Sequence, residues 1–190
     1  MNQTLVTILQ RRSVRRFTKE QVPQPDLDAI LQAGCAAPYG GCEPPVRLIV
    51  VRNATVRERL AQAEKEGVDR QWSHKPDEEK YWNLFFAEAP ALVATLFRPT
   101  SVGGFDASSE ERIGLCSAAC AVENMLLAAT SLGLGACFVG PMPEAKTAFE
   151  TTLGVAPPWE FIGFVAVGYS AELPREKKPA DRRNMVQFLD

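Results

Sequence analysis

The chain of 190 residues contains a single histidine, His74, and only five cysteines, none of them in paired spacing. A structural zinc site takes about four ligands, so one histidine argues against such a site. A Ser–His–Asp triad would have to recruit His74 from a polar stretch without a nucleophile elbow, which argues against hydrolytic chemistry. The glycines between residues 133 and 140 do not form a dinucleotide-binding GxGxxG motif. An odd number of unpaired cysteines does not indicate a disulfide framework, so we expect a reducing, cytoplasmic compartment.

No uninterrupted apolar run is long enough to span a membrane. The longest apolar stretch, residues 115–139, is broken by four polar residues between positions 123 and 131, whereas a spanning helix needs roughly 20 predominantly apolar residues. Met1 is followed by polar residues and an early Arg11-Arg12 pair, so the sequence shows no signal peptide. We therefore expect no membrane partner, and we predict a buried core helix followed by a strand in this stretch.

Charge of one sign does not dominate, because 21 basic residues face 23 acidic ones and the formal net charge is −2. Nucleic-acid-binding domains carry a basic excess over a whole face, so we expect no nucleic-acid partner. Five basic residues fall within residues 1–20 and five within residues 172–190, with an acidic body between them. Two small basic clusters suit a compact anion such as a phosphate. Solvated surface arginines and lysines account for them equally well on composition alone.

The composition is that of one soluble domain, with 46% hydrophobic and 23% charged residues. Apolar spacing predicts a short opening helix and further helices from residue 25 to about 34, over 54–66, 109–132 and 143–153, with strands at 48–51, 92–97, 136–139 and 161–167. Residues 67–80 are polar and irregular, which predicts a lid within residues 67–86, and residues 171–190 form a polar tail. The interspersed helices and strands predict an α/β or α+β domain over residues 1–190, with helices around one sheet.

The strongest local signal is the segment Arg11-Arg12-Ser13-Val14-Arg15-Arg16-Phe17, directly after the predicted opening helix. Guanidinium groups match phosphate oxygens bidentately, and a serine hydroxyl adds a neutral donor beside them. This pattern is typical of a phosphate site. A basic helix end with surface ion pairs is the alternative, and basic clusters of that kind are common.

A second signal lies in the loop of residues 37–45, where three prolines and the pair Gly40-Gly41 exclude a helix. Gly40-Gly41 allows the backbone to approach a flat ligand closely, although a plain helix-to-strand connection explains the loop as well.

Cys116 and Cys120 stand one helical turn apart. Without further ligands nearby, we interpret them as small buried core thiols.

Together these segments resemble the nitroreductase family of FMN flavoproteins. The matching segments occur in the family order and are residues 11–17, 37–41, 123–129 (ENMLLAA), 132–135 (LGLG), 167–169 (VGY) and 177–179 (KKP). Each motif is weak alone, but their shared order over nearly the whole chain makes the resemblance specific.

The resemblance implies an α+β fold with a central, mostly antiparallel sheet flanked by helices, in an intertwined homodimer that holds two FMN molecules at its interface. The helix of residues 110–132 matches the helix that forms the dimer core. The cofactor-binding residues that the resemblance implies are Arg11, Arg12, Ser13, Arg15, Arg175 and Lys177 around the FMN phosphate, Pro38, Tyr39, Gly40 and Cys42 from the other subunit, and Val139 and Gly140 at the flavin N5 edge.

The chain departs from the family pattern around the flavin rim. Tyr39 stands where a serine is usual, Cys42 and Pro44 stand where an asparagine and a glutamine are frequent, and Val46 replaces a common tryptophan. These positions shape the substrate side of the flavin, so the substrate of any one relative does not carry over. The reductive dehalogenase branch grips an amino acid with a Glu, a Tyr and a Lys in its lid, and residues 64–81 here contain Glu64, Glu66, Lys75, Lys80 and Tyr81. A solvated lid with incidental charges is the simpler interpretation.

The resemblance predicts an enzyme that takes hydride from NADH or NADPH and reduces nitroaromatics, quinones or similar small oxidants in a ping-pong cycle, without a side-chain acid or base. The alternatives are reductive dehalogenation of halogenated aromatics, flavin fragmentation, and a non-enzymatic flavin-binding or redox-sensing module. Val139-Gly140-Pro141 offers no hydroxyl where the dehalogenase branch has a threonine beside N5. We therefore expect two-electron reduction and negligible deiodination.

Overall fold

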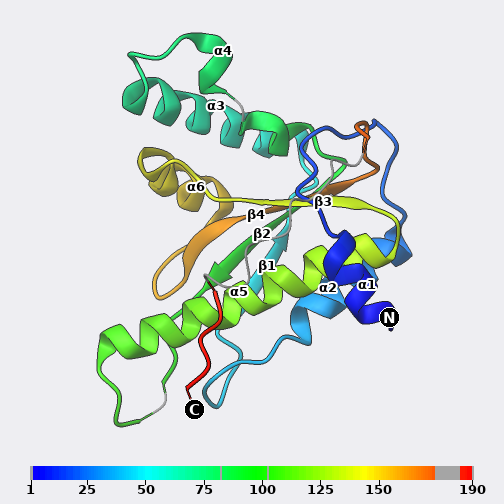
Figure 1. Ribbon diagram of the computed structural model, residues 1–190. Coiled ribbons are helices and arrows are strands. Elements are labelled where there is room, and N and C mark those ends of the chain that lie inside the picture. Colours follow the sequence, from blue (N-terminus) through cyan, green and yellow to red (C-terminus); the bar gives the residue numbers. More distant parts are fainter. Residues whose placement is uncertain (1, 82, 102, 174–184, 190) are drawn as a thin grey trace.

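The computed structural model describes residues 2–81, 83–101, 103–173 and 185–189. A four-stranded sheet with the strand order β1-β2-β4-β3 forms its centre (Figure 1). The strands are β1 (Val46–Val50), β2 (Ala91–Phe97), β3 (Gly135–Val139) and β4 (Glu160–Gly168). Every neighbouring pair is antiparallel. The mostly antiparallel sheet of the expected α+β fold is therefore confirmed.

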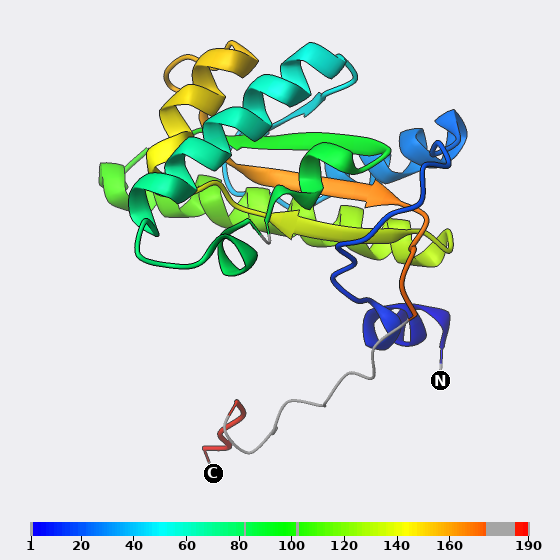
Figure 2. The same ribbon diagram turned by 90° about the horizontal axis from the view of Figure 1, so that it is seen from above.

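Helices cover both faces of this sheet. The α-helices are α1 (Gln3–Gln10), α2 (Gln24–Cys35), α3 (Ala54–Gln71), α4 (Asp77–Lys80), α5 (Ala107–Ser131) and α6 (Lys146–Leu153), and the short 3-10 helices are η1 (Leu84–Glu88) and η2 (Pro143–Ala145). Figure 2 shows α3 and α6 on one side of the sheet and α5 on the other. The chain is thus layered as helices, sheet and helices.

The two layers of core follow from the alternation of side chains along β2, which is buried over its whole length. Leu92 and Leu96 face α3 and α6, where they join a cluster of phenylalanines. Val93 faces α2 and α5, where it packs with Ile30 and Met125. The aromatic cluster comprises Phe86, Phe149, Phe161 and Phe164. A strand buried on both faces places β2 at the middle of the domain.

Helix α3 is longer than the sequence pattern predicts. It continues past residue 66 to Gln71, and α4 occupies part of the stretch that was expected to be irregular. Gly67 lies in the interior of α3, where a Cβ would stand 3.3 Å from Ala145 and Met142. Close packing of this glycine against η2 accounts for its place in a helix despite its poor propensity. The prediction of an irregular segment is therefore wrong for residues 67–71 and 77–80.

Helix α5 is the core helix that the apolar stretch predicted, and Asp106 caps it by accepting a hydrogen bond from the Ser109 N–H at 2.9 Å. By length and hydropathy it is the one helix, within the described ranges, that could cross a membrane. In the fold it packs against α2 and the sheet. The prediction that this helix is buried on all sides, however, is wrong, because Cys116 and Cys120 are exposed and Leu115 is 44% exposed. One face of α5 is therefore not covered by the described residues of a single chain.

At Gly114, α5 packs directly against the backbone that follows β2. A Cβ there would overlap the carbonyl oxygen of Arg98, and backbone cannot move aside as a flexible side chain can. We expect Gly114→Ala to lower the free energy of unfolding by about 1–3 kcal/mol, although alanine is the better helix former. Gly103→Ala is the control, because a Cβ at Gly103 meets nothing within 4 Å. Equal urea midpoints for the two variants would contradict this contact.

Candidate functional site

The basic segment after α1 is held in place along the edge of β3. Ser13 forms a parallel bridge with Ala136, and the Val14 N–H donates to the Ala136 carbonyl at 3.0 Å. Further along, the Thr18 N–H donates to the Tyr169 carbonyl at 2.9 Å. Residues 13–18 are thus extended and anchored at both ends, between β3 and the chain that leaves β4.

Three of the predicted phosphate ligands gather around a buried thiol. Arg11, Ser13 and Arg15 all act on Cys137, which lies in β3. Burial raises the pKa of the Cys137 thiol, and Arg15, a hydrogen bond with Ser13 and Arg11 lower it only in part. The thiol therefore stays protonated and adds no negative charge to the group. We call Arg11, Ser13 and Arg15 the basic cluster. Cys137 was not among the predicted site residues, since nothing in its sequence context distinguishes it from a core cysteine.

Two carboxylates contact the basic cluster. The Arg11 Nε lies 3.3 Å from the Glu123 Oε1 on α5, and the Glu123 side chain is 50% exposed. The Arg15 backbone N–H donates to the Glu172 Oε1 at 3.1 Å. An exposed ion pair of this kind is worth about 0–1 kcal/mol, so an anionic ligand can displace Glu123 from Arg11 at little cost.

Of the remaining predicted phosphate ligands, only Arg12 lies within the described residues. The Arg12 guanidinium donates to the carbonyls of Leu9 at 2.7 Å and Arg11 at 2.9 Å, where it caps the carboxyl end of α1. Arg175 and Lys177 fall outside the described residues. A role in phosphate binding stays a prediction for all three.

The predicted loop residues Pro38, Tyr39 and Gly40 line a hollow of about 580 Å³ against the first half of α5. The other lining residues are Phe105, Ser109, Arg112, Ile113, Cys116, Ser117 and Cys120. A Cβ at Gly40 would come within 2.6 Å of the Ile113 Cγ2, so glycine is required for the loop to sit this close to α5. Cys42 is exposed and does not line this hollow. We call this hollow the α5 pocket. Because Cys116 and Cys120 line it, their interpretation as buried core thiols is wrong.

The basic cluster and the α5 pocket are apart within one chain. Arg11 contacts α5 at Glu123, whereas Gly40 contacts it at Ile113. Ten residues of α-helix separate these contacts by about 15 Å. Val139 and Gly140 lie at the far end of β3 from the cluster, with Val139 paired to Phe164. A single chain therefore presents the predicted cofactor residues as separate groups.

Glu64 connects the lid side of the molecule to the turn that follows β3. It is fully buried on α3, and its carboxylate accepts the Met142 N–H at 3.0 and 3.2 Å and a hydrogen bond from the Asn83 amide. Burial raises the pKa of Glu64, against the lowering effect of these hydrogen bonds. Met142 lies two residues beyond Gly140, so Glu64 holds the turn at the predicted flavin edge. The interpretation of the lid charges as solvated is wrong for Glu64.

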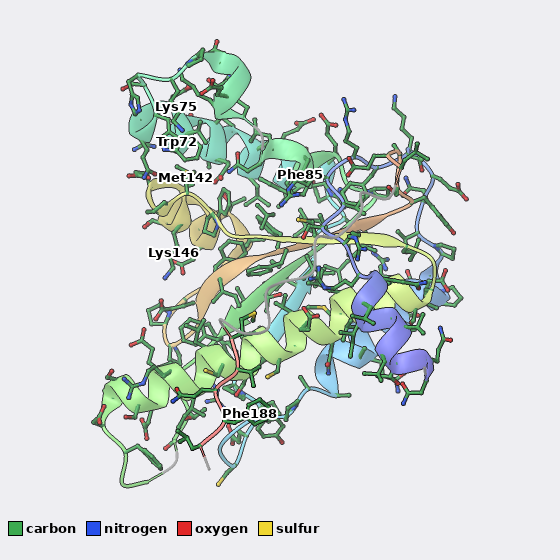
Figure 3. All side chains as sticks on the ribbon, in the orientation of Figure 1. Trp72, Lys75, Phe85, Met142, Lys146 and Phe188 are labelled. Carbon is green, nitrogen blue, oxygen red and sulfur yellow. The ribbon has the colours of Figure 1, made fainter. Side chains whose placement is uncertain are left out.

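Other lid charges pair within the lid itself. The Tyr81 hydroxyl donates to the Asp69 carboxylate, which raises the pKa of Tyr81 to about 12. The largely buried Lys80 contacts Asp77 at 3.2 Å. Lys75 lies over the ring of Trp72, at 4.7 Å from its centroid, near the end of α3 (Figure 3). These groups are already engaged with each other, which does not favour a grip on a zwitterionic substrate.

The buried Glu64 predicts a pH dependence of stability. Since its pKa is raised in the native state, that state binds more protons than the unfolded chain between the ordinary value of 4.5 and the raised value. The free energy of unfolding therefore falls as the pH rises through this interval. We expect Glu64→Gln, which cannot ionise, to be more stable than the wild type at neutral pH and to lose that advantage below the ordinary glutamate pKa.

The amide introduced by Glu64→Gln would keep an acceptor for the Met142 N–H. Asn83 can turn its Oδ1, a buried atom without a hydrogen-bond partner among the described residues, to accept from the new amide. Urea unfolding at a series of pH values measures the effect, with Glu58→Gln, an exposed position on the same helix, as the control. A difference between wild type and Glu64→Gln that does not vary with pH would contradict the raised pKa.

Comparisons with known proteins agree with this architecture. The model of the nitroreductase family matches residues 8–169. A protein of Archaeoglobus fulgidus, named as an NADH dehydrogenase or NAD(P)H nitroreductase, is 30% identical over 94% of this chain and 89% of its own. A Bacteroides fragilis nitroreductase solved with bound FMN is 30% identical, with a TM-score of 0.74 over 100% of both chains. An iodotyrosine deiodinase of Hydra vulgaris is 25% identical over 94% of this chain and 70% of its own.

Proposed function

This chain belongs to the nitroreductase family, and from that premise we propose that it is an FMN-dependent oxidoreductase that uses NADH or NADPH to reduce small oxidants such as nitroaromatics and quinones. The whole chain then serves as one FMN-binding domain, with residues 67–86 as its lid. The observation that carries the proposal is the basic cluster at the edge of β3. All five cysteines are free, which supports a cytoplasmic location.

The donors of the basic cluster fit a phosphate monoester. Arg11 and Arg15 supply charge-assisted hydrogen bonds and Ser13 a neutral one, beside the uncharged thiol of Cys137. The chain has no dinucleotide fingerprint, which favours FMN over FAD. When bound, FMN supplies the hydride-transfer chemistry, and the protein contributes binding and orientation.

The other predicted residues would shape the flavin and acceptor sites. Gly140 carries no side chain, so the turn after β3 can approach a flat ring closely. Glu64 fixes that turn through the Met142 N–H. The α5 pocket offers mostly apolar walls against which an aromatic acceptor can pack. We assign no side-chain acid or base to the reaction.

A homodimer is part of the proposal, because the predicted site is divided within one chain. On α5 an exposed stripe runs through Leu115, Cys116, Ala119 and Cys120 towards Glu123. Two copies that pack these stripes about a two-fold axis with their α5 helices antiparallel bring the Ile113 end of one helix to the Glu123 end of the other. The Pro38–Gly40 loop of one copy then approaches the basic cluster of its partner, and the two half-sites join.

Anaerobic reduction tests the activity. We expect the purified protein to be yellow, to bleach when NADH or NADPH is added under argon, and to regain its colour when a quinone or a nitroaromatic follows. A yellow protein that neither nucleotide bleaches would contradict an enzyme and support flavin storage or sensing. Rapid halide release from iodotyrosine would support the dehalogenase alternative, which the similarity to the Hydra enzyme favours. Tyr81 is hydrogen-bonded to Asp69 and Lys80 is paired with Asp77. These contacts favour the reduction of quinones or nitroaromatics over halide release from iodotyrosine.

A further inference from the structure

The α5 pocket combines aromatic walls with one cation. Tyr39 is 45% exposed and Phe105 55% exposed, and both rings line the pocket together with Ile113. Aromatic side chains in a mostly apolar lining with a few polar groups are typical of ligand pockets. Arg112 is the only lining side chain, in the described part of the chain, that carries a full charge at neutral pH.

Arg112 is oriented by a short chain of hydrogen bonds at the start of α5. Its Nη2 donates to the Ser109 Oγ at 3.0 Å, and the Ser109 hydroxyl donates to the Asp106 Oδ2 at 3.1 Å. The hydrogen bonds from Ser109 hold the pKa of Asp106 below its usual value, so the carboxylate remains an acceptor. Because Ser109 donates its one hydroxyl proton to Asp106, its oxygen lone pairs face Arg112. The neutral Ser109 hydroxyl therefore orients the Arg112 guanidinium.

Within one chain, no carboxylate pairs with Arg112 among the residues that the structure describes. The ion pairs of the described chain involve other arginines and lysines, and the one hydrogen bond of the Arg112 side chain uses a single Nη atom. A guanidinium has five N–H donors, so most of them remain for a ligand. A planar cation beside two aromatic rings recognises a flat ring that carries an anionic group.

We infer that Arg112 determines the acceptor specificity of this pocket, and that the favoured acceptors are aromatic oxidants with an acidic substituent such as a carboxylate or a sulfonate. The aromatic part lies against Tyr39, Phe105 and Ile113, and the acidic group pairs with the guanidinium. This inference rests on the proposed function, because it names the substrate class of the same site.

A matched pair of acceptors, 4-nitrobenzoate and 4-nitrobenzamide, isolates the charge of the substituent. In the wild type we expect a higher kcat/KM for the acid. Arg112→Gln should reduce the acid-to-amide ratio about tenfold or more, through a higher KM for the acid, because a charge-assisted hydrogen bond is lost. Arg112→Lys keeps the charge and should restore part of the ratio. Arg59→Gln removes an exposed arginine from α3, on the other side of the sheet, and should leave the ratio unchanged.

Binding without turnover separates this inference from the proposed function. Titration of the oxidised protein with benzoate and benzamide, followed by isothermal calorimetry, should show the same preference and its loss in Arg112→Gln. If the wild type reduces neither nitro compound but prefers benzoate, the proposed function fails and the assignment of Arg112 stands. An unchanged acid-to-amide ratio in Arg112→Gln would overturn the assignment. So would a loss of bound FMN with an equal fall in activity for both acceptors, since Arg112 would then act on the cofactor.

Discussion

Replacement of Leu115 with glutamate is expected to produce a folded monomer that purifies without FMN. Leu115 is 44% exposed in a single chain, so the fold itself tolerates a charge there. In a dimer built on the α5 stripe, the same carboxylate would be buried without a partner, at a cost of several kcal/mol. Two-fold symmetry places a second copy of the change in the same interface. Because FMN binds between the two copies in our proposal, its loss follows from the loss of the dimer.

Light scattering and the ratio of flavin to protein absorbance measure the two effects together. Thr55→Glu is the matched control, since it adds the same charge at an exposed position on α3, on the opposite side of the sheet. A fully flavinated dimer of Leu115→Glu would contradict the proposed interface, and a flavinated monomer would contradict the shared site. Ala118 and Ala121, on the same helix, are completely buried within one chain. Glutamate at either position would disrupt the fold and could not report on the dimer.

Removal of either arginine of the basic cluster is expected to weaken FMN binding about tenfold to a hundredfold. Arg11→Ala and Arg15→Ala each delete a charge-assisted hydrogen bond to the phosphate, worth about 1.5–3 kcal/mol, and each 1.4 kcal/mol corresponds to about one decade in affinity. Phosphate binding would break the ion pair between Arg11 and Glu123. We therefore expect the loss of FMN affinity in Arg11→Ala to lie near the lower end of this range. Titration of the apoprotein with FMN, followed by quenching of flavin fluorescence, gives the dissociation constants.

Arg16→Ala provides the control for this series. Arg11, Ser13 and Arg15 act on the Cys137 thiol, and Arg16 is not among the groups that do so. Arg16→Ala removes the same charge from the same segment but leaves Arg11, Ser13 and Arg15 in place. Equal losses of affinity in all three variants would indicate a general effect of charge and would contradict a specific phosphate site. Unchanged affinity in Arg11→Ala and Arg15→Ala would contradict the assignment outright.

The sequence alone predicts where the main elements lie. All four strands occur within two residues of the predicted positions, because short apolar runs bounded by glycine and proline are a local property of the chain. The ordered motifs identify the family, and the sequence also places Arg11, Ser13 and Arg15 together directly after the opening helix. The extension of α3 to Gln71 was missed, because Gly67 and the polar residues around it look like a loop until η2 packs against them.

What covers each residue was decided by the tertiary structure. Apolar periodicity predicts that α5 is a helix buried on every side, but it does not show that Cys116 and Cys120 are exposed within one chain. Glu64 looks like one of many lid charges, and it becomes a buried anchor only because the fold brings Asn83 and Met142 to it from distant parts of the sequence. Local sequence determines helices, strands and the chemistry of a segment. Contacts between residues far apart in the chain determine burial, and with it the ionisation of Glu64 and Cys137 and the exposed stripe of α5.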